Sequence, residues 1–249
     1  MNVLLSKGQC RFQYLYNSGF AIETENYYLI IDYYKKSALV TNERFPNKNI
    51  FVFVTHNHDD HFNPIIYNWS KDNNIRYIVH EDVPNTSTSN VLLVVPNQHY
   101  SLGNMIIETL GSTDSGVSFL ISVDNLTIFH SGDLNWWKWK GKSQEIHQQE
   151  ESDFKREIHK MLGRKLDIAF VPVDPRLEEY YDLAVKYFAK TIDVKTIVPM
   201  HFRDSLEPIQ QLADNWKGNI YSSQFIPVIK ENQSFYFDGE QVVNIRTQA

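Results

Sequence analysis

The sequence predicts an α/β protein in which layers of strands and helices enclose a core. Residues 11–32 contain apolar stretches separated by turn residues, a pattern typical of consecutive strands. Further along, short apolar stretches alternate with segments whose apolar residues recur at helical spacing. The chain has 249 residues, of which 42% are hydrophobic, so it is long enough to bury a sizeable core. We expect one domain, residues 1–249.

Composition and charge argue against several classes of function. The net charge is −6 and no basic stripe is visible, which argues against binding to a nucleic-acid backbone. The single cysteine, Cys10, rules out an intrachain disulfide and is expected to be a small buried residue. Residues 1–7 lack the apolar core of a signal peptide, and no apolar run approaches membrane length. The sequence therefore predicts a cytoplasmic protein that does not enter a membrane.

The first half of the chain is predicted to be rich in strands. Phe12, Tyr14 and Tyr16 recur at every second position, as on one face of a strand. Residues 63–69 carry apolar side chains at helical spacing, with a proline near the start, which indicates a short helix. Further strands are expected at residues 20–23, 27–32, 50–54, 76–79, 91–95, 104–110, 117–123 and 126–129.

The second half of the chain begins with a segment of different character. Residues 134–166 contain a charged stretch whose apolar residues recur at roughly helical spacing, so we expect a helical insertion here and not a second domain. A core strand is predicted at 166–173, then a helix that begins after Asp174, then a strand at 195–202. The remaining residues to 249 are expected to form short strands and turns, with a strand near 235–237.

A cluster of polar side chains directly follows the predicted strand at 50–54. Three imidazoles and two carboxylates fall within six residues, namely His56, His58, Asp59, Asp60 and His61. Imidazole nitrogen and carboxylate oxygen suit zinc, manganese or iron, and the absence of thiolates argues against a closed structural zinc site. The alternative is a polar loop that contains its histidines by chance, but a solvated turn does not need so many ligand groups.

The spacing His56-x-His58-x-Asp60-His61 resembles the signature of the metallo-β-lactamase-fold hydrolases. The resemblance implies an αββα sandwich of two mixed sheets flanked by helices. It also implies that the two spaced histidines serve one metal ion and that the Asp-His pair serves a second. Two further positions match the family's ordered motifs: Asp133, after the strand at 126–129, as the carboxylate between the metals, and His201, at the end of the strand at 195–202, as the last ligand.

The chain departs from the family pattern at one expected ligand. Ser112 stands where the family commonly has a further histidine for the first metal, and Asp114, two residues away, is a candidate replacement. The resemblance therefore implies zinc, with manganese or iron as alternatives, in one or two ions per chain. Asp60 and Asp133 are the candidate catalytic residues, although Asp59 is an alternative proton acceptor.

Other polar and aromatic residues near these motifs have two interpretations each. Asp32 and His130 are expected to orient the site more than to bind metal, and Arg176 is either a surface residue or a contact for an anionic substrate. The tryptophans at 136, 137 and 139 are either core residues or a substrate wall or subunit contact. The remaining histidines are expected to be structural or solvated: His80, His99, His147 and His159.

Together these features favour a metal-dependent hydrolase. The resemblance implies a metal-activated water that attacks an ester, lactone or phosphoester of a small molecule, and the second half of the chain resembles the L-ascorbate-6-phosphate lactonase-like branch. Two alternatives remain: a non-catalytic binding protein with a degenerate metal site, and a nuclease or RNA-processing member, which the acidic balance disfavours. Homo-oligomer formation is left open.

Overall fold

The structure is a computed structural model, which describes residues 4–37, 40, 47–71, 75–84, 90–216 and 221–243. The N-terminal and C-terminal ends of the predictions, residues 1–3 and 244–249, lie outside the described residues. Strands dominate the first half of the chain and helices become frequent in the second half, as expected.

The first sheet is mixed. Its strands, in spatial order, are β15 (Val242–Val243), β14 (Ser234–Phe237), β1 (Cys10–Tyr16), β2 (Gly19–Glu23), β3 (Tyr27–Ile31), β4 (Asn49–Val54), β5 (Ile75–His80) and β6 (Val91–Val94). The pairs from β15 to β3 are antiparallel, whereas β3, β4, β5 and β6 run parallel. The C-terminal strand β14 joins this sheet beside β1, with Cys10 opposite Phe237.

The second sheet is also mixed and follows the same plan. Its strands, in spatial order, are β13 (Gln224–Phe225), β12 (Asp193–Met200), β11 (Lys165–Pro172), β10 (Leu126–His130), β9 (Ser118–Val123), β8 (Met105–Leu110) and β7 (His99–Leu102). The strands from β13 to β10 are parallel, and those from β10 to β7 are antiparallel. Each sheet therefore contains a block of parallel strands whose carboxyl ends lie at one edge of that sheet.

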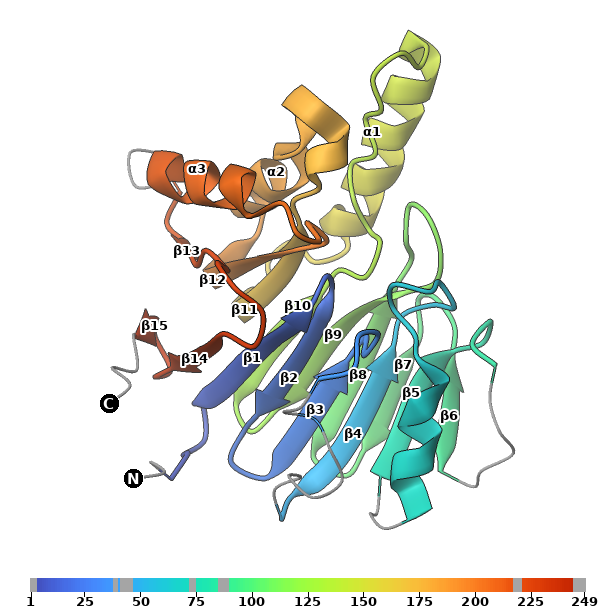
Figure 1. Ribbon diagram of the computed structural model, residues 1–249, viewed down its shortest axis with the longest axis vertical. Coiled ribbons are helices and arrows are strands. Elements are labelled where there is room, and N and C mark those ends of the chain that lie inside the picture. The colour runs from blue at the N-terminus through green and yellow to red at the C-terminus, as the bar shows by residue number, and fades with distance from the viewer. Residues whose placement is uncertain are drawn as a thin grey trace.

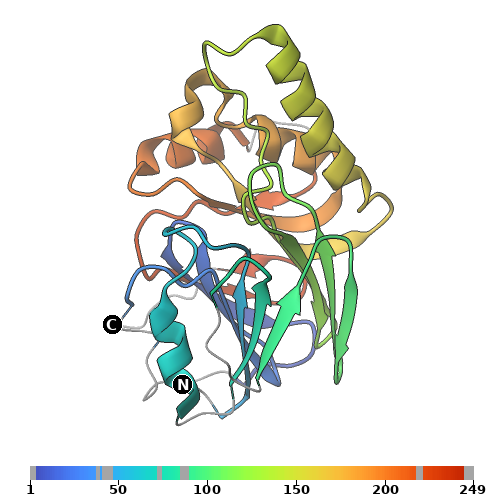
Figure 2. The ribbon, with the colours of Figure 1, turned by 90° about the vertical axis from the view of Figure 1, so that its right-hand side faces the viewer.

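The two sheets pack face to face and helices cover their outer faces. The helical elements are η2 (Pro64–Lys71), α1 (Gln144–His159), η3 (Pro175–Tyr180), α2 (Leu183–Thr191) and α3 (Leu206–Trp216). Figures 1 and 2 show α1, α2 and α3 together at one end of the molecule, with η2 beside the first sheet away from them. This arrangement is the two mixed sheets flanked by helices that the sequence predicted.

Side chains of β4 point alternately into two separate hydrophobic clusters, one on each face of the first sheet. Phe51 and Phe53 belong to the main core, which lies between the sheets and extends to α1, α2 and α3. Val52 and Val54 point to the other face, where they share a second core cluster with Trp69 of η2. Successive side chains of a strand point to opposite faces, so an uninterrupted apolar run is required where both faces are buried.

Two predictions about the second half of the chain were wrong. Residues 206–216 form the helix α3, with Ile209, Leu212 and Trp216 buried at helical spacing, in place of the short strands and turns expected there. The helix predicted after Asp174 is divided into η3 and α2, because Glu178 has a φ of 54° and interrupts the helical backbone. In the described part of the chain no helix combines the length and apolarity needed to span a bilayer.

Candidate metal centre

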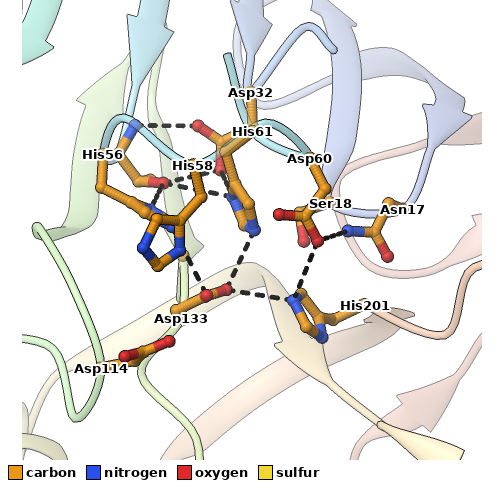
Figure 3. A network of polar contacts seen from close by, with 12 residues as sticks. Asn17, Ser18, Asp32, His56, His58, Asp60, His61, Asp114, Asp133 and His201 are labelled. Atoms are coloured by element: carbon orange, nitrogen blue, oxygen red, sulfur yellow. Dashed lines mark hydrogen bonds and ion pairs between the residues drawn. The ribbon is translucent and has the colours of Figure 1, made fainter. Parts of the chain in front are cut away.

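The candidate ligands lie in the loops that follow the carboxyl ends of strands from both sheets. His56, Asp60 and His61 follow β4, Asp133 follows β10, and His201 follows β12. Figure 3 shows these side chains converging on Asp133. Ligands bind most often in the crevice beyond the carboxyl ends of parallel strands, because several loops meet there. The structure thus brings together residues that are far apart in sequence.

Two glycines allow these loops to approach one another closely. Gly132, directly before Asp133, has a φ of 55°, and a Cβ atom there would lie 2.8 Å from the backbone oxygen of Val117. Gly116 has a φ of 72°, and its Cβ would lie 2.0 Å from the backbone oxygen of Thr55. Only glycine satisfies both the left-handed backbone and the lack of space. Gly132 therefore lets the backbone before Asp133 pass close to the loop at Val117.

Buried hydrogen bonds fix the ring orientation of two histidines. Asp32 Oδ2 lies 2.7 Å from Nδ1 of His61 and accepts a 2.8 Å hydrogen bond from Thr55 Oγ1. Thr55 Oγ1 in turn lies 2.9 Å from Nδ1 of His56. Thr55 donates its hydroxyl proton to Asp32. The same oxygen, Oγ1 of Thr55, therefore accepts a hydrogen bond from Nδ1–H of His56. Both rings therefore keep their protons on Nδ1 and present Nε2, as in other carboxylate–histidine–metal arrangements.

His201 is oriented in the same way by a different carboxylate. Its Nδ1 lies 3.1 Å from Asp174 Oδ2, and Arg176 Nε donates to both oxygens of Asp174 at 3.0 Å. These hydrogen bonds, together with the backbone N–H of Arg176, outweigh burial and lower the pKa of Asp174 to about 2. The position of Asp174, directly after an apolar strand, is the same signal that drew attention to Asp32, although the sequence analysis assigned it no role.

The three oriented imidazoles meet at the two oxygens of Asp133. Oδ1 of Asp133 lies 3.0 Å from Nε2 of His61 and 3.3 Å from Nε2 of His201, whereas Oδ2 lies 3.5 Å from Nε2 of His56. Burial alone would raise the pKa of Asp133, but the neighbouring His61 and His201 outweigh it and hold the pKa well below its usual range. The carboxylate is therefore charged, and its two oxygens face different histidines.

The atoms at this meeting point face one another as ion pairs but form no hydrogen bond of good geometry. Among the described residues, Nε2 of His56, Nε2 of His61 and Oδ1 of Asp133 are buried without a hydrogen bond of acceptable geometry. Buried polar atoms without partners are costly, so a cluster of three aimed at one point requires an explanation. A divalent cation satisfies all three at once, and the oxygen and nitrogen donors fit zinc, manganese or iron. The residues present therefore fit the metal that the sequence motif implies.

The surroundings shift the pKa values of the neighbouring His56 and His61 in opposite directions. Burial, followed by repulsion from His61, lowers the pKa of His56 to about 4, so this ring is neutral. Burial would also lower the pKa of His61, but the carboxylates of Asp133 and Asp32 raise it well above its usual value. The two carboxylates thus favour positive charge at this position, and a metal ion there would compete with any proton on Nε2 of His61.

Asp60 lies at the edge of the same cluster. Its Oδ2 is 3.8 Å from Nε2 of His201 and accepts hydrogen bonds from Asn17 Nδ2 at 3.1 Å and from Arg203 Nη2 at 3.2 Å. Asp60, His61 and His201 each offer a donor atom within 4.8 Å of the others, and so do His56, His61 and Asp133. Asp59, by contrast, is exposed and does not line the cavity over the cluster.

His58 is exposed, and the centre of its ring lies 4.4 Å from that of buried His56. Its Nε2 lies 3.4 Å from Ser115 Oγ, and it forms a further possible ligand group with Asp114 and Asp133. Asp114 is exposed, and its backbone N–H donates to Ser112 Oγ at 3.3 Å. The structure therefore places Asp114, the candidate replacement for the missing histidine, among the grouped donors.

A cavity of about 360 Å³ opens over the cluster. Trp137 and Trp139 line it, with their rings stacked at 5.9 Å, and Trp137 Nε1 donates to the backbone oxygen of Asp133. Trp136 packs away from the cavity, 6.1 Å from Phe154 of α1. The expectation of a tryptophan wall is thus confirmed for two of the three residues, while Trp136 belongs to the core.

The cavity also contains residues to which the sequence analysis gave no role. Glu150 of α1 and Arg203 line it, together with Arg176, which was expected mainly at the surface. Arg203 stands two residues after His201, and that proximity was the available signal. For Glu150 no local signal exists, because its place in the wall depends on how α1 packs.

The remaining histidines lie outside the cluster. His130 Nε2 hydrogen-bonds the backbone oxygen of Ser18 at 2.8 Å, so this buried ring supports the loops without reaching Asp133. His147 is half-buried and bonds the backbone oxygen of Trp139 at 2.9 Å, which corrects the expectation that it is merely solvated. The others face solvent or local partners: His80 beside Asp82, His99 exposed on β7, and His159 beside Tyr187.

Comparison with known proteins agrees with this geometry. A family model described as a beta-lactamase superfamily domain matches residues 11–201. The fold is similar to a metallo hydrolase, Igni18, from the archaeon Ignicoccus hospitalis, with a TM-score of 0.63, 14% identity, and coverage of 92% of this chain and 99% of that chain. No curated protein matches the chain by sequence.

Two further solved structures have the same fold. The metallo-β-lactamase fold protein YhfI from Bacillus subtilis is 12% identical, with a TM-score of 0.60 and coverage of 92% of this chain and 99% of that chain. CmlA, a diiron β-hydroxylase from Streptomyces venezuelae, is 11% identical, with a TM-score of 0.53 and coverage of 92% of this chain and 54% of that chain. At such identities the likeness extends to the fold and not to the reaction.

Proposed function

Because the chain belongs to the beta-lactamase superfamily, we propose that it is a metal-dependent hydrolase of a small-molecule ester, lactone or phosphoester. The observation that carries this proposal is the convergence of three oriented imidazoles on Asp133, with buried donor atoms that lack partners among the described residues. A protein that had lost its metal would not need to keep these atoms unpartnered in its interior, where they are costly.

We assign the metal ligands as the six residues of the motifs: His56, His58, Asp60, His61, Asp133 and His201. Asp133 faces His61 and His201 with one oxygen and His56 with the other, so it is the residue positioned to touch two ions. When bound, such ions lower the pKa of water to near neutrality and polarise the bond that is cleaved. Zinc is the proposed metal, with manganese or iron as alternatives.

The side chains around the ligands have separate tasks. Asp32 and Asp174 keep the Nδ1 protons of His61 and His201 in place, so that Nε2 remains available. Asn17 and Arg203 hold Asp60 at the edge of the cluster, which leaves Asp60 committed as a ligand. Trp137 and Trp139 exclude water from one side of the cavity. The cavity of about 360 Å³ suits a small molecule better than a polymer chain.

Neither of the other functions considered has comparable support. A nuclease would need a basic footprint, whereas the net charge is −6. A non-catalytic binding protein requires a degraded site, and only the Ser112 position departs from the expected ligand set. Membership of the lactonase-like branch is a finer proposal that rests on the strand–helix–strand pattern of the second half. The cytoplasmic location and any homo-oligomer stay predictions.

The test combines metal content with hydrolysis. The purified protein is analysed for bound elements, stripped with chelator, reloaded with zinc, manganese or iron, and assayed on a panel of chromogenic esters, lactones and phosphodiesters. We expect reloading to restore hydrolysis of at least one substrate class, and His61→Ala to abolish it. His159→Ala is the matched control, because His159 is exposed on α1 far from the donor groups. Protein that binds no metal, or that hydrolyses nothing when fully loaded, would overturn the proposal.

A further inference from the structure

Two arginines line the cavity beside the metal centre, and one of them, Arg176, was interpreted from the sequence as either a surface residue or a contact for an anionic substrate. Arg176 comes from η3 and Arg203 from the loop after β12. We propose that these two guanidinium groups bind an oxyanion of the substrate, a phosphate or a carboxylate, next to the bond that is cleaved. This inference rests on the proposed function, and it adds the chemical class of the substrate.

Arg176 is held in one orientation before any ligand arrives. Its Nε and Nη2 atoms bind the carboxylate of Asp174, and its Cζ lies 5.6 Å from the ring centre of Trp139. The side chain is nevertheless 44% exposed. Within the described residues Nη1 has no hydrogen bond, so this edge of the fork remains for a ligand. Fixing a guanidinium in advance reduces the entropy that binding must otherwise remove.

Arg203 is placed beside the metal centre itself. Its Nη2 donates to Asp60 Oδ2 at 3.2 Å, and the side chain is 51% exposed. Asp60 is a proposed ligand, so an anion that binds the rest of this guanidinium must lie next to the reacting atoms. The backbone of Arg203 has a φ of 50°, and that of His201 has a φ of 63°. This unusual backbone turns the loop so that both side chains reach the same cavity.

The lining of the cavity carries both signs of charge, and two of its carboxylates, Asp60 and Asp133, belong to the proposed metal centre. The arginines come from the loops after β11 and β12, whereas Asp114 and Glu150 come from the β8–β9 loop and α1. Burial, and then the proximity of Asp153 and Asp114, raises the pKa of Glu150, so a further negative charge beside this residue is disfavoured. Arg176 and Arg203 are the arginines of this lining, so away from the metal itself an anionic group is favoured beside them, which gives the substrate a defined orientation.

The chemistry of the site selects an oxyanion. Guanidinium forks match the geometry of carboxylate and phosphate oxygens and form charge-assisted hydrogen bonds with both. The indole face of Trp139, next to Arg176, offers an apolar surface for the rest of a small substrate. A simpler explanation is that each arginine only positions its aspartate. The two explanations differ in whether loss of an arginine discriminates between charged and neutral ligands.

The experiment measures binding by calorimetry, so that it does not depend on hydrolysis. Phenylphosphonate, benzoate and neutral benzyl alcohol are titrated into the full chain, both stripped of metal and loaded with zinc. The variants are Arg176→Gln, Arg203→Gln and the double variant. Arg164→Gln is the matched control, because Arg164 is 48% exposed and is paired with Glu108 outside this cavity. Circular dichroism verifies that each variant is folded.

We expect each single variant to weaken binding of an oxyanion probe about tenfold, or about 1.4 kcal/mol, and the double variant to weaken it more. Binding of benzyl alcohol and the behaviour of Arg164→Gln should not change. Tighter binding of phenylphosphonate or of benzoate identifies the group as phosphate or carboxylate.

Three results would overturn the inference. In the first, the wild type binds neither phenylphosphonate nor benzoate; in the second, the double variant binds them as tightly as the wild type; in the third, the variants lose affinity for benzyl alcohol to the same extent. Arginine-dependent binding in a protein that hydrolyses nothing would instead count against the proposed hydrolase function alone.

Discussion

Asp32 Oδ2 lies 2.7 Å from Nδ1 of His61, and both side chains are fully buried. The carboxylate determines which nitrogen of the ring carries the proton, although it does not reach the donor cluster. Asp32 has a φ of 49°, and it also accepts hydrogen bonds from the backbone N–H and the hydroxyl of Thr55. One side chain thus orients His61 directly and His56 through Thr55.

This relationship predicts the effect of Asp32→Asn. The amide keeps the size of the side chain but can present a donor to His61, which favours the wrong tautomer. We expect metal affinity to fall about 10- to 100-fold, the range typical for the loss of such outer partners. Competition with a chromogenic chelator measures it. Asp124→Asn is the control, since Asp124 also holds a turn through Thr24 but lies away from the cluster. Equal affinity in the wild type and Asp32→Asn would contradict the orienting role.

Much of the site could be predicted because its residues follow strands. An apolar run followed by clustered imidazoles and carboxylates marked the strand tip at His56, whereas Asp133 and His201 were assigned from their resemblance to the family's ordered motifs, each of which follows a predicted strand. The strands β4, β10 and β12 are not neighbours, since β4 belongs to the other sheet and β11 separates β10 from β12, so the resemblance and not local pattern grouped these residues. The signal of a carboxylate after an apolar strand was also present at Asp174 and was not used.

The parts that could not be predicted depend on packing between distant segments. Pairing of β14 with β1 joins Phe237 to Cys10, and no local periodicity encodes such a partner. The presence of Glu150 in the cavity depends on the placement of α1. In contrast, α3 was missed although Ile209, Leu212 and Trp216 show its spacing, so that error came from the interpretation and not from the sequence.

Asp133→Ala should abolish hydrolysis while the protein remains folded. Asp133 is the residue whose two oxygens face different imidazoles, so its loss removes a shared ligand from both proposed ions. The loss of activity should be accompanied by lower metal content, whereas circular dichroism should resemble that of the wild type. If activity persists near the wild-type rate with full metal content, Asp133 does not bridge two ions.

Cys10 should be unreactive in the folded protein. The side chain is fully buried on β1, and this burial, with a smaller effect from Asp167, raises the pKa of the thiol. Because the thiolate is the reactive form, iodoacetamide at pH 8 should leave the native chain unlabelled. The same treatment in denaturant should add one label per chain, since the sequence contains one cysteine. Rapid labelling of native protein would show that β1 opens readily or that the thiol is accessible.

The last prediction concerns the strength of the two proposed metal sites. His61 belongs to two of the donor groups, one with His56 and Asp133 and one with Asp60 and His201, and its one outward-facing nitrogen serves one ion. Asp133 Oδ1 faces His61 and His201, which favours a first ion held by these residues and Asp60. The second ion is then left with His56, His58 and the other oxygen of Asp133.

The second site lacks a histidine at Ser112, whose neutral hydroxyl is a poor zinc ligand. Asp114 is grouped with His58 and Asp133, but it is exposed, so it should restore only part of the affinity. Titration of stripped protein should therefore show one tight ion and one weaker ion. Asp114→Asn should weaken the second further, and Ser112→His should raise bound metal towards two per chain. Two equally tight sites in the wild type would refute this order, as would a single ion that is lost in His56→Ala but kept in His61→Ala.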